Sequence, residues 1–236
     1  MNEPEVWRNR APGDLSAELP ELHRIDVGPA VARSKKAYRD WRHLTLDERK
    51  RHLRRCQDAL RERQDEISQM IALEVGKRLR EAQLEVGGVI AKFDLTFEDA
   101  DEYAADRFVD GGAHPALVRR RPRGPAAVIS PFNFPIFLGH GATVAYLLAG
   151  NTVIYKPSPL AGNVGAAYAS AMQGALPEGV FELVQGGGHT GRDLCLDPDV
   201  RSVCFTGSVD AGRQLAIDLA ADSAAGSAAD LAAGPS

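Results

Sequence analysis

Residues 125–219 alternate short apolar runs rich in valine and isoleucine with longer helix-compatible segments, separated by turns that contain glycine or proline. We expect strands at 126–129, 152–155, 180–184 and 200–205, and helices at 137–148, 164–176, 191–196 and 211–219. Strands that alternate with helices through short loops pair in parallel, because each helix carries the chain back to the starting edge of the sheet. The alternation predicts an α/β fold with a Rossmann-like, doubly wound, mostly parallel sheet.

Residues 26–110 show the helical period instead. Asp26 is placed to cap a first helix, and Thr45-Leu-Asp-Glu48 has the pattern of a capping box that opens a second one. The apolar stripe of this second helix continues to Gly76, a typical helix-ending residue, and a third helical stretch covers 79–103. The many arginines and glutamates on these helices indicate a solvated face. We therefore expect an N-terminal helical segment ahead of the sheet.

The remaining segments follow neither pattern. Residues 1–25 are polar and broken by prolines, which predicts an extended arm. A basic turn beside apolar residues predicts a hairpin at about 115–124. The segment 220–236 contains only Ala, Asp, Ser, Gly, Leu and one Pro, so we expect a low-complexity tail that packs little. One main domain, 26–219, with its parallel α/β part at 125–219, is then flanked by two simpler ends.

The composition is that of a globular protein, with 44% hydrophobic and 25% charged residues among 236. The formal net charge of −4 is too small to indicate a nucleic-acid or membrane-surface partner. No apolar run approaches the roughly 20 residues that span a bilayer, and no leader opens the sequence. The cysteines, Cys56, Cys195 and Cys204, are odd in number and lack the spacing of a metal site. We expect a cytoplasmic protein of a reducing compartment, without a metal, nucleic-acid or membrane partner.

The end of the first predicted strand carries the most distinctive motif, Ser130-Pro-Phe-Asn-Phe-Pro135. Open parallel sheets bind ligands at the carboxyl ends of their strands. Two prolines stiffen this turn, and it presents the carboxamide of Asn133, a suitable donor for a developing oxyanion. In the other interpretation, Asn133 bonds its own backbone in a proline-rich turn. The motif alone does not decide between these two roles.

Three further strand ends carry weaker signals. Lys156, in Lys-Pro-Ser158, could donate to a ribose or a phosphate, or could be an ordinary surface lysine. The run 185–191 could present backbone N–H groups to a phosphate, although it lacks a full GxGxxG pattern. Phe205-Thr-Gly-Ser208 opens a helix, and Ser208 is also a candidate N-cap. Together, four signals at successive ends of one sheet predict a ligand site at this edge.

The order and spacing of these segments resemble the aldehyde dehydrogenase superfamily, whose members oxidise aldehydes with NAD or NADP. The matching segments are Glu74-Val-Gly-Lys77 with Glu81-Ala82, Arg121-Pro-Arg-Gly124, Ser130-Pro-Phe-Asn-Phe-Pro135, Ala149-Gly-Asn-Thr152, Lys156-Pro-Ser158, Leu176-Pro-Glu-Gly179 and Phe205-Thr-Gly-Ser208. The resemblance covers about residues 9–215. Glu182-Leu-Val-Gln-Gly-Gly with Thr190-Gly191 is most similar to the succinylglutamate semialdehyde dehydrogenases of arginine catabolism.

The resemblance implies a role for each strand end. Residues 129–132 would line the nicotinamide-ribose side of a cofactor groove, and Asn133 would donate to the oxyanion. Lys156 would contact the adenosine ribose, Gly187 and Gly191 would allow close approach of the adenine end, and the pyrophosphate would lie against Ser208. The implied cofactor set is Ile129, Ser130, Pro131, Phe132, Lys156, Ser158, Gly187, Thr190, Gly191, Phe205, Gly207 and Ser208, with Asn133 as the catalytic residue. The domain 26–219 would thus bind NAD or NADP.

Two further features bear on cofactor choice and on assembly. Pro159 stands where the family commonly has a glutamate, three residues after the lysine. The loss of this carboxylate near the ribose leaves NADP open beside NAD. The basic segment from Leu117 to Arg123 resembles the family's oligomerisation hairpin, which implies a homo-oligomer.

The family mechanism uses two residues that this sequence does not supply in the expected order. The resemblance implies a nucleophilic cysteine and a general-base glutamate in a Leu-Glu-Leu-Gly-Gly-like segment. No Leu-Gly-Gly follows Leu219, and no cysteine follows Cys204. The three cysteines present each have the setting of a small buried hydrophobe. We therefore expect the catalytic domain to be absent and the chain to be inactive by itself.

Two hypotheses follow. In the first, the chain is the cofactor-binding portion of an aldehyde dehydrogenase, either a truncated or frameshifted product or a subunit whose partner chain carries the nucleophile. An aldehyde substrate would then bind only with that catalytic domain. In the second, the chain is a non-catalytic module that binds a dinucleotide or other subunits. In both, apolar surface that the family packs against its catalytic domain would be exposed, which predicts oligomerisation or marginal solubility.

Overall fold

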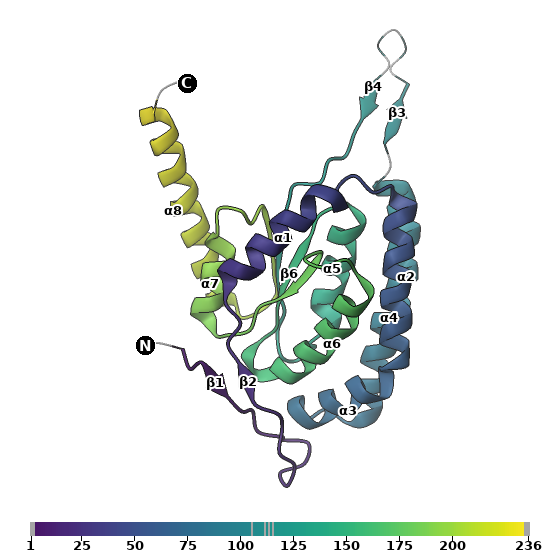
Figure 1. Cartoon of the computed structure of the whole chain (residues 1–236), viewed down its shortest axis with the longest axis vertical. Helices are drawn as coiled ribbons and strands as arrows, with labels where there is room; N and C mark the ends of the chain where they lie inside the picture. Colours follow the sequence, from purple (N-terminus) through teal and green to yellow (C-terminus); the bar gives the residue numbers. More distant parts are fainter. Residues whose placement is uncertain (1–2, 105, 111, 113, 115, 234–236) are drawn as a thin grey trace.

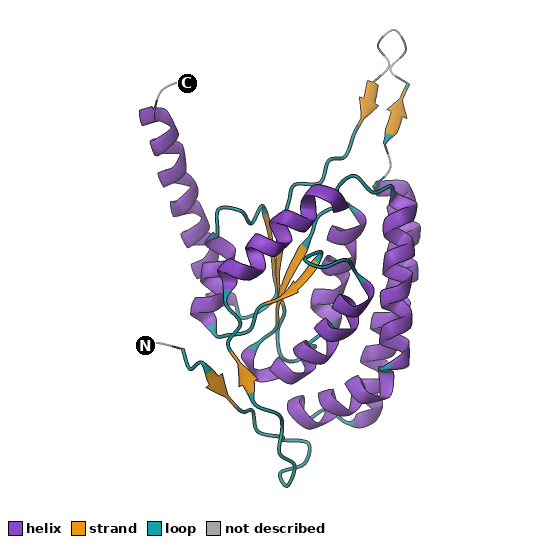
Figure 2. Cartoon of the chain, viewed as in Figure 1, coloured by secondary structure: helices purple, strands orange, loops and turns teal. Residues whose placement is uncertain are grey.

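Four parallel strands form the centre of the molecule (Figures 1 and 2). The computed structural model describes residues 3–104, 106–110, 112, 114 and 116–233. The strands are β5 (Ala126–Ile129), β6 (Val153–Lys156), β7 (Phe181–Leu183) and β8 (Ser202–Phe205). They are arranged in the order β7-β6-β5-β8, with every pairing parallel. The chain thus steps outward from β5 to β7 and then returns to the free side of β5 with β8.

Helices cover both faces of this sheet. The helices α5 (Phe137–Leu148) and α6 (Gly162–Ala175) pack on one face, and α1 (Val27–Trp41) and α7 (Gly188–Leu196) pack on the other. Neighbouring residues of a strand divide accordingly, since Val128 belongs to the first core and Ala127 to the second. Burial on both sides is the condition for a doubly wound parallel sheet. The predicted fold class is confirmed, and each predicted strand lies within two residues of its expected position.

A further layer of helices lies outside α5 and α6. It consists of α2 (Leu46–Glu62), α3 (Gln64–Val75) and α4 (Leu79–Tyr103). In Figure 1 these helices stand beside α5 and α6 on the side away from α1. The predicted N-terminal helical segment is therefore present, and it encloses the larger of the two hydrophobic cores.

The ends of these helices show which terminal signals act as expected. The capping box is present, because the N–H of Glu48 donates to Thr45 Oγ1 at 3.2 Å and the N–H of Thr45 donates to Glu48 Oε2 at 2.7 Å. Gly76 ends α3 with a φ of 79°, a left-handed conformation that favours glycine. Asp26 occupies the N-cap position of α1, but its side chain makes no capping bond. The single helix expected from Leu46 to Gly76 is two helices, since the backbone leaves helical geometry at Arg63.

The hairpin differs from its predicted position. Its strands are β3 (Arg107–Val109) and β4 (Ala116–Val118), which pair antiparallel and extend away from the body of the molecule (Figure 1). The helical part therefore ends at Tyr103 rather than at residue 110, and residues 119–123 form a connecting segment instead of a second strand. Pro122 lacks the N–H that a strand pairing uses, and the side chain of Arg120 donates to the carbonyl of Tyr103 at 2.5 Å.

The C-terminal helix is longer than predicted. The helix α8 runs over Val209–Ala233 instead of ending at Leu219, so most of the expected tail is helical. Alanine has the highest helix propensity, and it continues the helix where no apolar period is present to read. The last residues of the tail prediction, 234–236, lie outside the described part of the chain. No helix within the described residues is long and apolar enough to cross a membrane.

The N-terminal arm lies along the carboxyl edge of the sheet. It contains two short antiparallel strands, β1 (Val6–Trp7) and β2 (Leu22–His23). The side chain of Asn9 donates to the carbonyl of Pro159 at 2.8 Å, and the N–H of Ile25 donates to the carbonyl of Gln185 at 3.0 Å. Because Pro159 follows β6 and Gln185 follows β7, the arm is fixed at the edge where the strands end.

Candidate functional site

A cavity of about 960 Å³ opens at the carboxyl ends of the strands. It lies at the ends of β5 and β8, where the strand order reverses, and residues of α7 and α8 form its sides. Open α/β sheets bind ligands at this reversal point. Every predicted site residue except Thr190 lines the cavity. These residues are Ile129, Ser130, Pro131, Phe132, Asn133, Lys156, Ser158, Gly187, Gly191, Phe205, Gly207 and Ser208.

Asn133 lies in a turn that two hydroxyl groups hold closed. Ser130 Oγ and the hydroxyl of Tyr155 both donate to the carbonyl of Pro135, at 2.8 and 2.6 Å. Burial raises the pKa of Tyr155, so its hydroxyl remains protonated as a donor. The side chain of Asn133 is exposed at the cavity, and its carboxamide bonds to no other described residue. The turn therefore presents a free donor, and the alternative in which Asn133 bonds its own backbone is not the arrangement found.

Lys156 is a buried cation at the end of β6. The residue is 3% exposed, and its Nζ donates to the carbonyl of Pro157 at 3.3 Å. Burial disfavours the charged form and lowers the pKa of Lys156 to about 8, while the nearby Glu3 carboxylate acts in the opposite direction. An ammonium group has three protons to donate. Lys156 thus retains donor capacity at the wall of the cavity, which the surface-lysine alternative does not explain.

The N-terminus of α7 already holds an anion from this chain, the carboxylate of Glu3. The backbone N–H groups of Gly187, His189 and Thr190 donate to it at 2.9, 2.6 and 3.4 Å, and Thr190 Oγ1 donates at 2.5 Å. Partial burial would raise the pKa of Glu3, but these hydrogen bonds outweigh it and hold the pKa below its usual value. Thr190 is therefore engaged with Glu3 instead of lining the cavity.

The end of β8 combines a structural role with a position on the cavity. Ser208 Oγ accepts from the N–H of Ala211 at 3.3 Å, so Ser208 caps α8 as the N-cap interpretation expects. Gly207 is required for close packing, since a Cβ there would lie 2.5 Å from the ring of Phe205. Both residues also face the cavity. A helix N-terminus facing a cavity is a favourable position for a phosphate group.

Several cavity residues on the faces of helices have no counterpart among the predicted site residues. Arg192 on α7 donates through Nε to Asp218 on α8 at 2.7 Å, and the hydrogen bonds from Arg192 and Gln214 lower the pKa of Asp218. Leu138 on α5 also lines the cavity. None of them lies at a strand end, so motif spacing gave no signal for them.

The cysteines do not have the environment of an activated nucleophile. Burial raises the pKa of Cys56 to about 12 and that of Cys195 to about 11, although the Lys156 ammonium partly offsets the effect at Cys195. Cys204 is half-buried, and burial raises its pKa as well. Reactive thiols have a lowered pKa, because the thiolate is the nucleophile. Within the described residues, no group of three or more His, Cys, Asp or Glu side chains is arranged to hold a metal ion.

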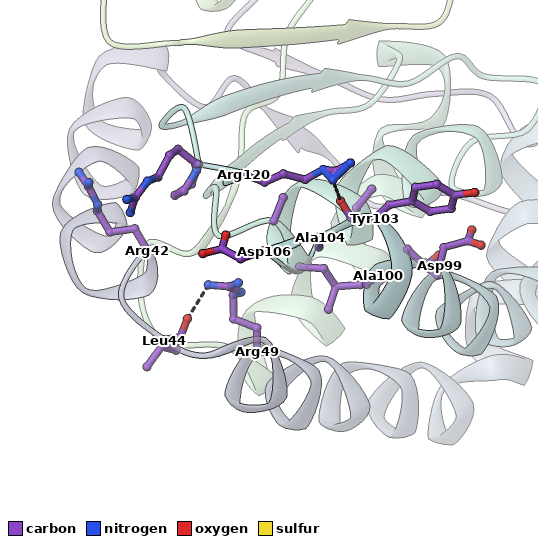
Figure 3. Close-up of a pocket in the computed structure, with 15 residues that line it drawn as sticks. Arg42, Leu44, Arg49, Asp99, Ala100, Tyr103, Ala104, Asp106 and Arg120 are labelled. Carbon is purple, nitrogen blue, oxygen red and sulfur yellow. Dashed lines mark hydrogen bonds between the residues drawn. The ribbon is translucent and has the colours of Figure 1, made fainter. Parts of the chain in front are cut away.

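A second, smaller cavity lies near the base of the hairpin, away from the strand ends (Figure 3). It encloses about 450 Å³, and its charged lining side chains come from α2, from α4, from the segments that flank the hairpin, and from Arg42, which follows α1. Arg49 donates to the carbonyl of Leu44 at 2.6 Å, and Arg120 donates to that of Tyr103 at 2.5 Å. Burial lowers the pKa of Arg49. No predicted site residue lines this second cavity.

Comparisons with known proteins agree with the fold. The model of the aldehyde dehydrogenase family matches residues 4–232. This chain therefore belongs to the aldehyde dehydrogenase family.

Individual members of this family match nearly the whole of this chain but less than half of their own length. An N-succinylglutamate 5-semialdehyde dehydrogenase of Burkholderia orbicola is 37% identical over 213 residues, which are 89% of this chain and 44% of that protein. An NAD-dependent aldehyde dehydrogenase from Sinorhizobium meliloti is 28% identical with a TM-score of 0.84, covering 91% of this chain and 44% of its own. An NADP-dependent glyceraldehyde-3-phosphate dehydrogenase from Bacillus halodurans, complexed with NADP, has the same identity and TM-score and covers 91% and 47%. The chain thus spans about half the length of the relatives it matches.

Proposed function

We propose that this chain forms the NAD(P)-binding part of an enzyme that oxidises an aldehyde to the acid. One observation carries the proposal: residues from three separate strand ends and the start of α7 converge on a single cavity at the reversal point of the sheet. The family supports NAD or NADP as the cofactor, and the two solved structures described above are named as NAD- and NADP-dependent enzymes. A semialdehyde such as that of succinylglutamate is the proposed substrate class, because that activity is in the name of the Burkholderia relative.

The residues present fit a dinucleotide. Lys156 offers a buried cation with spare donors, and the N-terminus of α8 at Ser208 faces the same cavity. Residues 129–132 would form the wall on the nicotinamide side, and Asn133 would donate to the oxygen of an aldehyde. A bound nicotinamide would supply the hydride acceptor. The chain's own contribution is to orient these groups and to hold a donor at the oxyanion position.

The nucleophile and the general base would come from residues other than those of this chain. The three thiols here have a raised pKa, and Asn133 alone activates no nucleophile. We therefore expect cofactor binding without aldehyde oxidation when the chain is alone. A catalytic partner segment would complete the site.

Calorimetry with NAD and NADP tests the proposal directly. The chain is expected to bind at least one of the two saturably, and Lys156→Met should weaken binding at least about tenfold through loss of the buried cation. Lys35→Met is the matched control, because Lys35 lies on α1 and pairs with Asp199 at 2.7 Å on the surface. Incubation with a semialdehyde should produce no reduced nicotinamide. The absence of binding at millimolar concentration would refute the cofactor role, and turnover by this chain alone would refute the external nucleophile.

We also propose that the chain associates with itself through the hairpin. Phe108 is 80% exposed on β3, and Leu117 and Val118 on β4 are each 38% exposed. Exposed apolar side chains on a projecting hairpin indicate an interaction surface. Light scattering is expected to show an oligomer that Phe108→Ser weakens; a monomer at all concentrations would contradict this. The cytoplasmic location remains a prediction.

A further inference from the structure

Glu3 lies 184 residues before Gly187 in the sequence, yet its carboxylate is at the start of α7. The anchored arm explains this position. The N–H of Arg24 donates to the carbonyl of Glu5 at 2.7 Å, and Trp7 Nε1 donates to the carbonyl of Pro159 at 3.4 Å. Glu3 therefore precedes a segment that is fixed at the carboxyl edge of the sheet. Its place at α7 is a consequence of the fold of the arm.

The start of α7 is shaped to receive this carboxylate. A Cβ on Gly187 would lie 2.6 Å from Glu3 Oε1, so a side chain at this position would displace the carboxylate from where it lies. Three N–H groups and one hydroxyl of residues 187–190 donate to the two carboxylate oxygens. The same loop contributes Gly187 and His189 to the wall of the cofactor cavity. The carboxylate and the cavity therefore share one short loop.

Glu3 also influences the buried cation of the site. Its negative charge favours the protonated form of Lys156, against the effect of burial. Pro159, which follows Lys156 on the wall of the cavity, supplies no carboxylate. The acidic residue that lines the cavity, Asp218, is engaged by Arg192. Glu3 is thus the carboxylate that acts on Lys156 at this end of the cavity.

We propose that Glu3 is a specificity-determining residue that makes the site favour NAD over NADP. The inference rests on the proposed cofactor function. A carboxylate near the adenosine ribose accepts a hydrogen bond from a 2′-hydroxyl, whereas a 2′-phosphate brings about two further negative charges against it. If that phosphate bound at the start of α7, Glu3 would lose the hydrogen bonds that it accepts there from four donor groups. Discrimination arises because the carboxylate repels the wrong ligand as well as attracting the right one.

Calorimetric titration of the whole chain with NAD, NADP, adenosine 5′-monophosphate and adenosine 2′,5′-bisphosphate tests this assignment. The wild type is expected to bind NAD at least about tenfold more tightly than NADP. Glu3→Gln should remove most of that ratio, chiefly by improving NADP, and the two adenosine nucleotides should show the same change. Glu5→Gln is the matched control, because Glu5 is an exposed carboxylate of the same arm whose side chain pairs with Arg24. That variant should leave the ratio unchanged.

The possible results distinguish a failure of the role of Glu3 from a failure of the proposed cofactor binding. If NAD binds but the wild type prefers NADP, or if Glu3→Gln leaves the ratio as it was, the role of Glu3 is wrong and the cofactor function stands. If no dinucleotide binds to the wild type or to either variant, the cofactor function fails and the inference fails with it. Equal effects of Glu3→Gln and Glu5→Gln would reveal a general charge effect and would also refute the assignment.

Discussion

Three glutamates from the N-terminal half of the chain each accept hydrogen bonds from backbone N–H groups at the start of a helix in the α/β part. Two of these glutamates are buried in the core, and the third is half-buried on the arm. Glu74 on α3 accepts from the N–H groups of Asn163 and Val164, at 3.1 and 2.8 Å, at the start of α6. Glu85 on α4 accepts from the N–H groups of Ile136 and Phe137, at 3.4 and 3.3 Å, at the start of α5. Glu3 on the arm does the same at α7. All three place negative charge where the helix dipole is positive.

The surroundings decide what this shared interaction does. Glu74 and Glu85 are 4% and 5% exposed and belong to helices that are packed into the core. Glu3 is half-buried on an extended arm, and it accepts from the N–H groups of Gly187 and His189, which line the cavity. A carboxylate buried in the core can only hold two parts of the fold together. A carboxylate next to a cavity can also attract or repel a ligand that binds in that cavity. Glu74 and Glu85 thus join the helical layer to the α/β part, at the starts of α6 and α5.

The largest loss of stability is expected when one of the two buried carboxylates is removed. Glu85→Ala leaves the ammonium of Lys77, which donates to Glu85 at 2.5 Å, and two helix N–H groups without their acceptor. We expect a loss of about 3 kcal/mol in the free energy of unfolding, measured by urea denaturation. The control is Glu98→Ala, an exposed glutamate on the same helix, with a change within about 0.5 kcal/mol. Small changes in the free energy of unfolding at both positions would contradict the claim that the buried carboxylate of Glu85 stabilises the fold.

An intermediate effect is expected at Lys156, with a definite dependence on pH. Its pKa is about 8 in the folded chain against an ordinary 10.5, so between these values the unfolded chain binds more protons. Stability from this group therefore rises as pH increases from 8 to 10.5 and is lowest below pH 8. Lys156→Met should exceed the wild type in stability by about 2 kcal/mol at neutral pH, and the difference should shrink as pH rises from 8 to 10.5. A difference that is independent of pH would show that Lys156 is not a buried cation.

The smallest effect is expected at Glu3. Replacing it by Gln keeps an acceptor at the start of α7, so the loss of stability should be no more than about 1 kcal/mol. The pKa of Glu3 is lowered, so its contribution is present above its ordinary value of 4.5 and is lost as pH falls below it. Thermal unfolding at pH 7 and pH 3 measures this. A loss of stability as large as that of Glu85→Ala would show that Glu3 acts as the buried carboxylates do, and it would count against a role of Glu3 in specificity.

The sequence predicted the sheet well and its periphery less well, for physical reasons. Strands buried on both faces are continuous apolar runs, so β5 to β8 were found within two residues. The break at Arg63 was missed, because the apolar period continues across it from Leu60 to Ile67. The strand β3 has three residues, all exposed, and carries no alternation to read. The extension of α8 was missed because an alanine-rich segment has no periodic pattern.

The residues of the candidate site also fall into a group that the sequence predicts and a group that it does not. Residues at strand ends could be predicted, because the doubly wound fold brings consecutive strand ends together. Glu3 could not, since no local pattern links an arm residue to a helix that begins at Gly188. Arg192 and Asp218 lie on helix faces whose neighbours are set by tertiary packing. The sequence therefore gives the location of the site, while the groups that shape its selectivity require the structure.

Backbone amide NMR during titration with NAD tests the central claim most directly, because it locates the bound cofactor. We expect saturable shift changes at 129–133, 187–191 and 205–208, around the cavity at the strand ends. The amides of Arg42 and Arg49, at the second cavity, should remain unchanged. Changes concentrated at that second cavity, or none at millimolar NAD, would contradict the account.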